Sequence, residues 1–330
     1  MATYVVTGGA GFIGSNIVFA LEAQGHDVVV IDKLGSGDKW RNLSKRRLAG
    51  LAHPNSTLST LEGIKGPISA VFHLGAISST TEIDSDLIVE TNFRLSCKLW
   101  DWCARRETPF IYASSAATYG NGANGFLDRD DATHLASLRP LNPYGWSKHL
   151  FDRWACDRRD RADLPDPPRW AGLKFFNVYG PNEYHKGGQR SMAVQMFDQI
   201  TDGGRVQLYH SYDPSYADGA QRRDFIWVKD CVEIALWFAN EPRTNGLYNV
   251  GTGEAHSFIE LADAVYSAIK RPPQINYISM PKNLRARYQY FTEADTSKLA
   301  AAGYKNRLMP FSDAVHQYVG NYLMAEDPYV

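Results

Sequence analysis

A tyrosine and a lysine four residues apart, Tyr144 and Lys148, have a spacing that could support proton transfer. On a helix, residues i and i+4 share one face, so these two side chains can meet. Tyrosine, with a pKa of about 10, is a poor base at neutral pH, but an adjacent ammonium and a positively charged nicotinamide ring both stabilise its phenolate. The pair therefore predicts acid/base catalysis of hydride chemistry on a nicotinamide cofactor. By itself the spacing is common, and a tyrosine packed beside a surface lysine is the alternative.

A segment rich in hydroxyl groups, residues 112–120, precedes this pair and contains the end of a predicted strand. Catalytic groups gather at the carboxyl ends of parallel strands, so these hydroxyls are expected beside the Tyr144 and Lys148 pair. Ser115 could hydrogen-bond the reacting oxygen. Ser114 is the competing choice for that role, and a simple cap at the end of the strand is the third interpretation.

A glycine-rich turn lies at residues 7–14, between a predicted strand at 4–7 and a predicted helix from 11 to 24. Glycines allow a tight turn and a close approach of the backbone to a pyrophosphate, and the start of the helix supplies amide donors to the anion. Asp32 ends the second predicted strand, where a dinucleotide site needs an acid. The segment predicts a dinucleotide-binding site.

The choice between NAD and NADP stays open in the sequence. Asp32 would accept hydrogen bonds from the adenosine ribose, which favours NAD because a carboxylate repels a 2′-phosphate. Lys33 or Lys39 could neutralise that phosphate and allow NADP instead. Both lysines could also be solvated surface residues.

The elements that must position these groups alternate between strands and helices along the first half of the chain. Strands are expected at 4–7, 28–32, 70–74, 110–114 and 173–176, and one long helix at 84–106. This alternation predicts an α/β fold, a Rossmann-type doubly wound parallel sheet with a smaller, mixed α/β substrate domain.

The composition shifts toward loops and tyrosines after residue 180. We expect residues 1–180 to form the dinucleotide-binding domain and residues 181–330 the substrate domain. An apolar run followed by a helical stretch suggests that residues 224–250 return to the first domain.

The composition also narrows the class of protein. With 35 Lys and Arg against 36 Asp and Glu, the formal charge of −1 offers no basic field for nucleic acid or an anionic membrane. No apolar run approaches the length of a membrane span. The four cysteines have no metal-like spacing, so we expect no metal site and core thiols in a reducing cytoplasm.

Together, the glycine-rich turn, Ser115, Tyr144 and Lys148 resemble the extended short-chain dehydrogenase/reductase family of nucleotide-sugar enzymes. The resemblance covers nearly the whole chain and implies a tightly bound NADP or NAD and a homo-oligomer. Within that family, residues 78–82, 176–181, 185–187 and 287–292 are similar to members that act on ADP-heptose. This similarity implies an ADP-heptose nucleotide-sugar substrate and a role in making the heptose of the lipopolysaccharide core.

The family contains several reactions, so individual residues must select among them. A dehydratase of this family carries an acid and a base beside the hydroxyl-rich strand, where this chain has Ala116 and Ala117. Epimerisation at the exocyclic sixth carbon calls for a second acid/base, because hydride must return to the opposite face of a transient ketone. Lys186 resembles the second base of the epimerases, although it could instead be a solvated lysine or bind a phosphate or the nicotinamide ribose. His185 is expected to be structural.

The resemblance and the turn together imply two sets of contact residues. The residues expected at the cofactor are Gly8, Gly11, Phe12, Ile13, Gly14, Asp32, Lys33, Lys39, Leu74, Gly75, Ala76, Ser78, Asn92, Lys148, Val178 and Lys186. Those expected at the substrate are Ser79, Ser115, Asn177, Ser191, Tyr209, Arg223 and Tyr288, with the arginine pairing with the diphosphate. Loops at 188–190 and 209–221 look longer than in the family.

Two rival functions are consistent with parts of the same pattern. A UDP-hexose 4-epimerase or a related nucleotide-sugar reductase would share everything up to Lys148 but would not need Lys186 as a base. A non-catalytic sensor that binds NAD(P) would use the same turn. The sensor has no use for a phenolate, so the grouping of Ser115, Tyr144 and Lys148 favours an enzyme.

Overall fold

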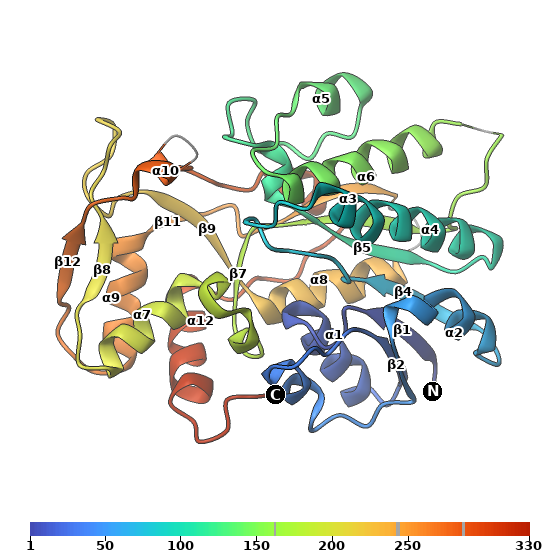
Figure 1. Cartoon of the computed structure of the whole chain (residues 1–330), viewed down its shortest axis with the longest axis horizontal. Coiled ribbons are helices and arrows are strands. Elements are labelled where there is room, and N and C mark those ends of the chain that lie inside the picture. Colours follow the sequence, from blue (N-terminus) through green and yellow to red (C-terminus); the bar gives the residue numbers. More distant parts are fainter. Residues whose placement is uncertain (162, 242–244, 286–287) are drawn as a thin grey trace.

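A computed structural model describes residues 1–161, 163–241, 245–285 and 288–330. Its centre is a parallel sheet of seven strands in the order β10-β6-β5-β4-β1-β2-β3 (Figure 1). The strands are β1 (Thr3–Thr7), β2 (Asp27–Ile31), β3 (Gly50–Ala52), β4 (Ile68–His73), β5 (Phe110–Ser115), β6 (Trp170–Phe175) and β10 (Gly246–Val250). The parallel, Rossmann-type sheet predicted from the alternation of strands and helices is confirmed.

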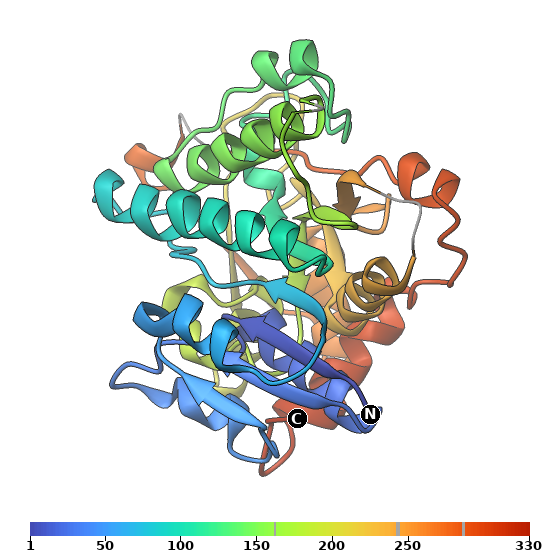
Figure 2. The ribbon, with the colours of Figure 1, turned by 90° about the vertical axis from the view of Figure 1, so that its right-hand side faces the viewer.

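Helices cover both faces of this sheet because its strands are apolar on both sides. In β1, Tyr4 and Val6 pack into the core that includes α1 and α8, whereas Val5 points into the core that includes α4 and α6. Figure 2 shows α4 and α6 side by side over one face. The covering helices are α1 (Phe12–Ala23), α2 (Thr57–Gly63), α4 (Leu95–Arg105), α6 (Pro143–Arg159) and α8 (Val228–Asn240).

Strand register brings the chemistry to one edge of the sheet. In the two ladders of β1, Thr7 pairs with Ile31 of β2 on one side and with His73 of β4 on the other. The chain therefore winds in opposite directions away from β1, and the loops after β1 and β4 diverge to leave a crevice. Ligands of open parallel sheets bind in such a crevice, outside the carboxyl ends of the strands.

The long helix expected at 84–106 is interrupted by a wider turn. It begins as α3 (Ser85–Ile88), continues as a π-helix, η3 (Val89–Arg94), and ends as α4. The π-helix carries Asn92, whose side chain bonds both backbone groups of Ile77 and donates to Ser147 Oγ at 3.0 Å. One buried amide thus ties the loop after β4 to the helix that carries Tyr144.

A second layer of structure lies beside the carboxyl edge of the main sheet and contains two small sheets (Figure 1). Strands β7 (Asn177–Tyr179), β9 (Arg222–Trp227) and β11 (Ala255–Ser257) form one, and β8 (Val206–Tyr209) and β12 (Ile275–Ile278) form the other. The helices are α7 (Met192–Thr201), α9 (Phe258–Ala268), α10 (Lys282–Arg285) and α12 (Phe311–Tyr318). Of these helices, α7, α9 and α12 contribute to a third apolar core.

Several short elements complete the chain. These are η1 (Asp38–Leu43), η2 (Pro54–Ser56), η4 (Ala116–Tyr119), α5 (Ala132–Ser137), η5 (Tyr184–Gln189), α11 (Ser297–Ala301) and η6 (Val319–Leu323). After β9, the chain re-enters the first part through α8 and β10, which pairs with β6 at the edge of the main sheet. Among the described residues, no helix has the length and apolar character needed to cross a membrane.

His73 makes the stability of this core depend on pH. It is buried between Thr7 and Ser96, and burial, together with the charge of Lys148, lowers its pKa to about 3. Below pH 6.5 the unfolded chain takes up a proton that the folded chain refuses, so stability falls as the pH drops from 6.5 toward 3. By pH 5 this histidine costs about 2 kcal/mol. We expect His73→Asn to reduce the loss of stability between pH 7.5 and 5, measured by urea unfolding; an unchanged dependence would contradict it.

Candidate functional site

A cavity of about 620 Å³ opens at the carboxyl edge of the main sheet. Most of the residues predicted from the sequence line it together. They are Gly8, Gly11, Phe12, Ile13, Gly14, Asp32, Lys39, Leu74, Gly75, Ala76, Ser78, Ser115, Tyr144, Lys148, Asn177, Val178, Lys186 and Ser191. The volume and the polar lining suit a small organic ligand.

The glycine-rich turn forms a cradle in which side chains would not fit. Gly8 adopts a φ of 69°, and a Cβ there would lie 2.5 Å from the backbone nitrogen of Gly75. A Cβ on Gly14 would collide with the carbonyl of Gly8, so only glycine lets α1 start this close to β1. The free amides at the start of α1 face the cavity, which fits the pyrophosphate of a dinucleotide.

The Gly14→Ala variant tests this cradle. The added methyl group must push α1 away from the turn, and we expect it to lower cofactor affinity at least about tenfold, because the amide donors then miss the pyrophosphate. Cofactor content after purification and titration with NAD and NADP measure the change. Gly63→Ala is the matched control, since a Cβ there meets nothing within 4 Å. Equal affinity for both variants would contradict the assignment.

Asp32 directly follows β2 and is already paired. One carboxylate oxygen accepts the amide of Ala10 at 2.8 Å, and the other accepts Lys39 Nζ at 2.6 Å. Lys39 is about a quarter exposed and lines the cavity, whereas Lys33 is exposed and does not. The charge of Lys39 therefore offsets the repulsion that Asp32 would exert on a 2′-phosphate.

Lys39→Ala is expected to change the preference between the two cofactors. Without the ammonium, the carboxylate of Asp32 repels a 2′-phosphate, so affinity for NADP should fall about tenfold or more relative to NAD. The ratio of the two dissociation constants measures this effect. Lys33→Ala serves as a nearby control with a smaller expected change, and an unchanged ratio in Lys39→Ala would refute the prediction.

Tyr144 and Lys148 lie in the first two turns of α6. Asn142 caps the helix by accepting the amide of Gly145 at 2.8 Å, and Pro143 occupies its first turn. Burial raises the pKa of Tyr144, and a hydrogen bond with the side chain of Ser115 opposes that rise. Burial also lowers the pKa of Lys148 to about 8. The three side chains line the same cavity and form one acid/base group.

The structure separates the two serines at the end of β5. Ser115 lines the cavity, accepts the amide of Ala117 at 3.1 Å and bonds Tyr144. Ser114 also borders the cavity, but it is only 2% exposed, and its hydroxyl donates to Asp152 at 2.7 Å. Ser115 is therefore the hydroxyl available to a substrate oxygen.

Lys186 reaches the same cavity from η5. Its ammonium lies 5.3 Å from the centre of the Phe12 ring. Burial lowers the pKa of Lys186, and the nearby carboxylate of Glu183 opposes this change. Its neighbour His185 also lines the cavity, with Nδ1 3.2 Å from Asn42 Nδ2. Burial therefore makes the Lys186 ammonium a better proton donor than that of a solvent-exposed lysine.

Six predicted site residues lie outside the lining of this cavity. They are Lys33, Ser79, Asn92, Tyr209, Arg223 and Tyr288. Ser79 instead contacts the rim, where its hydroxyl accepts from Gln189 Nε2 at 3.2 Å. Asn92 is buried behind the wall, where it joins the loop after β4 to α6. Arg287, part of the segment 287–292 quoted above, lies outside the described residues.

Arg223 and Tyr288 form a cluster beside Phe258, which does line the cavity. The Arg223 guanidinium is 5.5 Å from the centre of the Tyr288 ring and 5.6 Å from that of Phe258. It donates to the backbone carbonyls of Arg222 and Gln289. Tyr209 packs edge-on against Tyr288. The predicted diphosphate clamp is thus held by the protein's own carbonyls in this structure.

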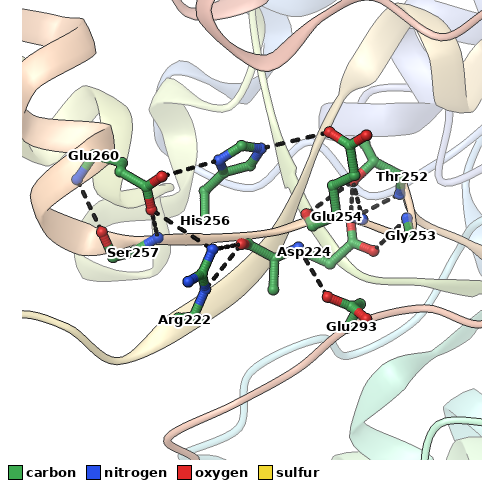
Figure 3. A network of polar contacts seen from close by, with 10 residues as sticks. Arg222, Asp224, Thr252, Gly253, Glu254, His256, Ser257, Glu260 and Glu293 are labelled. Carbon is green, nitrogen blue, oxygen red and sulfur yellow. Dashed lines mark hydrogen bonds and ion pairs between the residues drawn. The ribbon is translucent and has the colours of Figure 1, made fainter. Parts of the chain in front are cut away.

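The residue after Arg223 anchors the strand that carries it (Figure 3). Asp224 is fully buried and accepts the amides of Thr252, Gly253 and Ala294 at 2.7 to 3.0 Å. Burial raises the pKa of Asp224, and these hydrogen bonds oppose that rise. On the adjacent surface, His256 lies between Glu254 and Glu260. The network fixes β9 against the loop after β10, and so fixes the position of Arg223.

Sequence reasoning missed several residues that line the cavity. Among them are Met192 and Gln195, three residues apart on one face of α7, and Phe225 and Phe258 from the third core. The helical spacing after Ser191 was a usable signal for the first two. The two phenylalanines resemble ordinary core residues, and only the fold shows that they face a ligand site.

Comparison with known proteins agrees with this geometry. The model of the NAD dependent epimerase/dehydratase family matches residues 4–251. The ADP-L-glycero-D-manno-heptose-6-epimerase of Nitratidesulfovibrio vulgaris (strain DP4) is 49% identical over 330 residues, covering 99% of this chain and 100% of that protein. The enzyme of the same name from Fusobacterium nucleatum subsp. nucleatum is 42% identical over 335 residues, covering 99% of both chains.

Solved structures show the same architecture. The Helicobacter pylori ADP-L-glycero-D-manno-heptose-6-epimerase superposes with a TM-score of 0.79 at 26% identity, over 97% of this chain and 96% of that one. The Thermus thermophilus UDP-glucose 4-epimerase, in complex with NAD, superposes with a TM-score of 0.74 at 28% identity, over 96% of this chain and 97% of that one. The predicted resemblance to nucleotide-sugar enzymes is confirmed. The chain belongs to the NAD dependent epimerase/dehydratase family.

Proposed function

We propose that this protein is an ADP-heptose 6-epimerase that inverts the exocyclic sixth carbon of its substrate for the heptose of the lipopolysaccharide core. The observation that carries the proposal is the convergence of two proton-transfer groups, Tyr144 and Lys186, on one cavity from separate elements. An enzyme that only oxidised or reduced one face would need one such group. The relatives named above, at 42% and 49% identity, support the substrate.

The residues of the cradle would hold NADP or NAD, and when bound the nicotinamide supplies a reversible hydride acceptor. Tyr144 takes the proton of the carbinol hydroxyl as the carbon is oxidised. Once substrate is bound, Ser115 would turn its one hydroxyl hydrogen from Tyr144 to the same oxygen and hold it in place. Lys148, one helical turn away, stabilises the phenolate by its charge.

Lys186 serves the opposite face of the transient ketone. Rotation of the short exocyclic arm presents that face without turning the sugar ring, and Lys186 then protonates the oxygen as the carbon is reduced. Its lowered pKa suits this exchange. Asn177 and Ser191, which line the cavity, would bond sugar hydroxyls, and Ser79, Tyr209, Arg223 and Tyr288 are proposed for the outer part of the substrate.

A direct test is to incubate the purified protein with ADP-heptose of one configuration at the sixth carbon and to follow that carbon by NMR. Inversion to a mixture of both configurations is the expected result. Activity on a UDP-hexose with no inversion of ADP-heptose would replace the proposal with a UDP-hexose 4-epimerase. Cofactor binding without turnover of either sugar would favour the sensor.

The cellular setting and the assembly are part of the same proposal. We place the protein in the cytoplasm as a homo-oligomer; the four cysteines, all free and three of them buried, support a reducing compartment. We also propose the division into a dinucleotide-binding part, 1–180 with 224–250, and a substrate part, 181–330. The pairing of β10 with β6 supports the return of the chain.

A further inference from the structure

A buried ion pair lies directly beneath the proposed catalytic group. Lys174 Nζ in β6 is 2.6 Å from Asp152 Oδ2 in α6, and the two side chains are 1% and 0% exposed. Isolated charges are costly to bury, so such a pair persists only when further hydrogen bonds satisfy it. Here Tyr112 and Ser114 both donate to the carboxylate, at 3.0 and 2.7 Å.

The pair is connected to Ser115 by hydrogen bonds on both sides. Ser114, adjacent in the chain, is held by Asp152. Lys174 donates to Thr118 Oγ1 at 2.9 Å, and the Thr118 hydroxyl donates to the carbonyl of Ser115 at 2.8 Å. These hydrogen bonds fix the backbone on both sides of Ser115, whose side chain lines the cavity.

The same pair lies on the helix that carries the other two groups. Asp152 follows Lys148 by four residues and Tyr144 by eight, so the three share one face of α6. The first turn of α6 is close to η4, since a Cβ on Gly145 would lie 2.8 Å from the carbonyl of Ala117. The ion pair thus joins β5, β6, η4 and α6 at the point where the catalytic side chains meet.

We propose that Asp152 and Lys174 are positioning residues for the reaction: they hold Ser115 against Tyr144, and their balanced charges set the electrostatic environment in which Tyr144 exchanges its proton. The proposal rests on the proposed function, since it assigns these residues to the Tyr144 station. Both charges are required, because Asp152 alone would favour the protonated form of Tyr144 and Lys174 alone would favour its phenolate.

The other groups that face Tyr144 and Lys148 add little fixed charge. His73 from β4 and His149 from α6 have pKa values lowered by burial to about 3 and about 4, so both are neutral at working pH. Lys186 lines the same cavity. Burial is the largest influence on both pKa values, raising that of Tyr144 and lowering that of Lys148, and the charge of Asp152 moves both upward. Lys174, 2.6 Å from Asp152, is the cation paired with that charge.

The test compares how kcat depends on pH in three variants of the full chain. Asp152→Asn removes the negative charge, so the acidic limb of the curve of kcat against pH should move to lower pH by about half to one unit. Lys174→Met leaves Asp152 uncompensated, although still bonded by two hydroxyls, and the limb should move to higher pH by a similar amount. The double variant should return the limb to its original position, with kcat lowered about tenfold and KM little changed, since Ser115 is less firmly held.

Arg46→Met is the matched control, because it breaks a different ion pair, with Glu22 at 2.9 Å, whose side chains are partly buried and do not line the cavity. It should leave the limb in place. Limbs that shift in the same direction, or not at all, in the two single variants would overturn the proposal. Where a single variant does not fold, the double variant decides: a kcat equal to that of the wild type in the double variant would refute the proposal. Failure of the unmodified enzyme to invert ADP-heptose would instead count against the proposed function.

Discussion

Tyr144→Phe is expected to lower kcat by about 10²- to 10⁴-fold while leaving the fold and cofactor binding intact. The change removes one oxygen, which is the atom that takes the carbinol proton, and preserves the ring packing. Lys148 and Ser115 are poor replacements, because Lys148, with a pKa of about 8, is mostly charged and without a lone pair at pH 7, and a serine hydroxyl is too weakly acidic to exchange a proton there. Steady-state kinetics with ADP-heptose, together with titration of the cofactor, separate the two effects.

A second tyrosine provides the control for this experiment. Tyr248→Phe makes the same chemical change in β10, at a residue that does not line the cavity, and should retain wild-type turnover. Full turnover in Tyr144→Phe, with cofactor still bound, would remove the central claim about the catalytic pair.

Lys186→Met is expected to reduce epimerisation by about 10²-fold or more, because the second face of the ketone loses its proton donor. Methionine keeps most of the apolar contact with Phe12, so the loop should stay in place. NMR of the sixth carbon measures inversion. If one isomer is still oxidised and reduced again without inversion, the Tyr144 station still works.

Lys229→Met is the matched control for the second station. Its ammonium also lies over an aromatic ring, 5.5 Å from the centre of Tyr322, but the residue does not line the cavity. We expect normal inversion in this variant. Normal inversion in Lys186→Met as well would mean that one acid/base serves both faces, as in the rival interpretation of a 4-epimerase.

The parts of the site that could be predicted from sequence are those built from local spacing. The i, i+4 relation of Tyr144 and Lys148 needs only a helix, and Asn142 and Pro143 mark where that helix begins. The glycine-rich turn likewise encodes its own conformation. For such features, residue type and spacing carry nearly all the physical information, and the structure adds the cavity that joins them.

Features that depend on contacts between distant segments could not be predicted. Nothing near Asp152 in the sequence indicates a partner 22 residues later in a buried strand. The choice between Ser114 and Ser115 depended on that same contact, since Asp152 binds one serine and frees the other. The turn of π-helix at Asn92 was also hidden, because its residues fit an ordinary helical pattern.

The path of the chain between the two parts has a consequence for protein engineering. The chain leaves the main sheet after β6, returns through α8 and β10, and leaves again toward β11. A designer therefore cannot exchange the substrate-binding part between relatives as one continuous cassette, because a single cut would also carry away the edge strand of the other part. Changes of sugar preference in this scaffold should be sought by altering individual side chains of α7 and β9, with the crossings left intact.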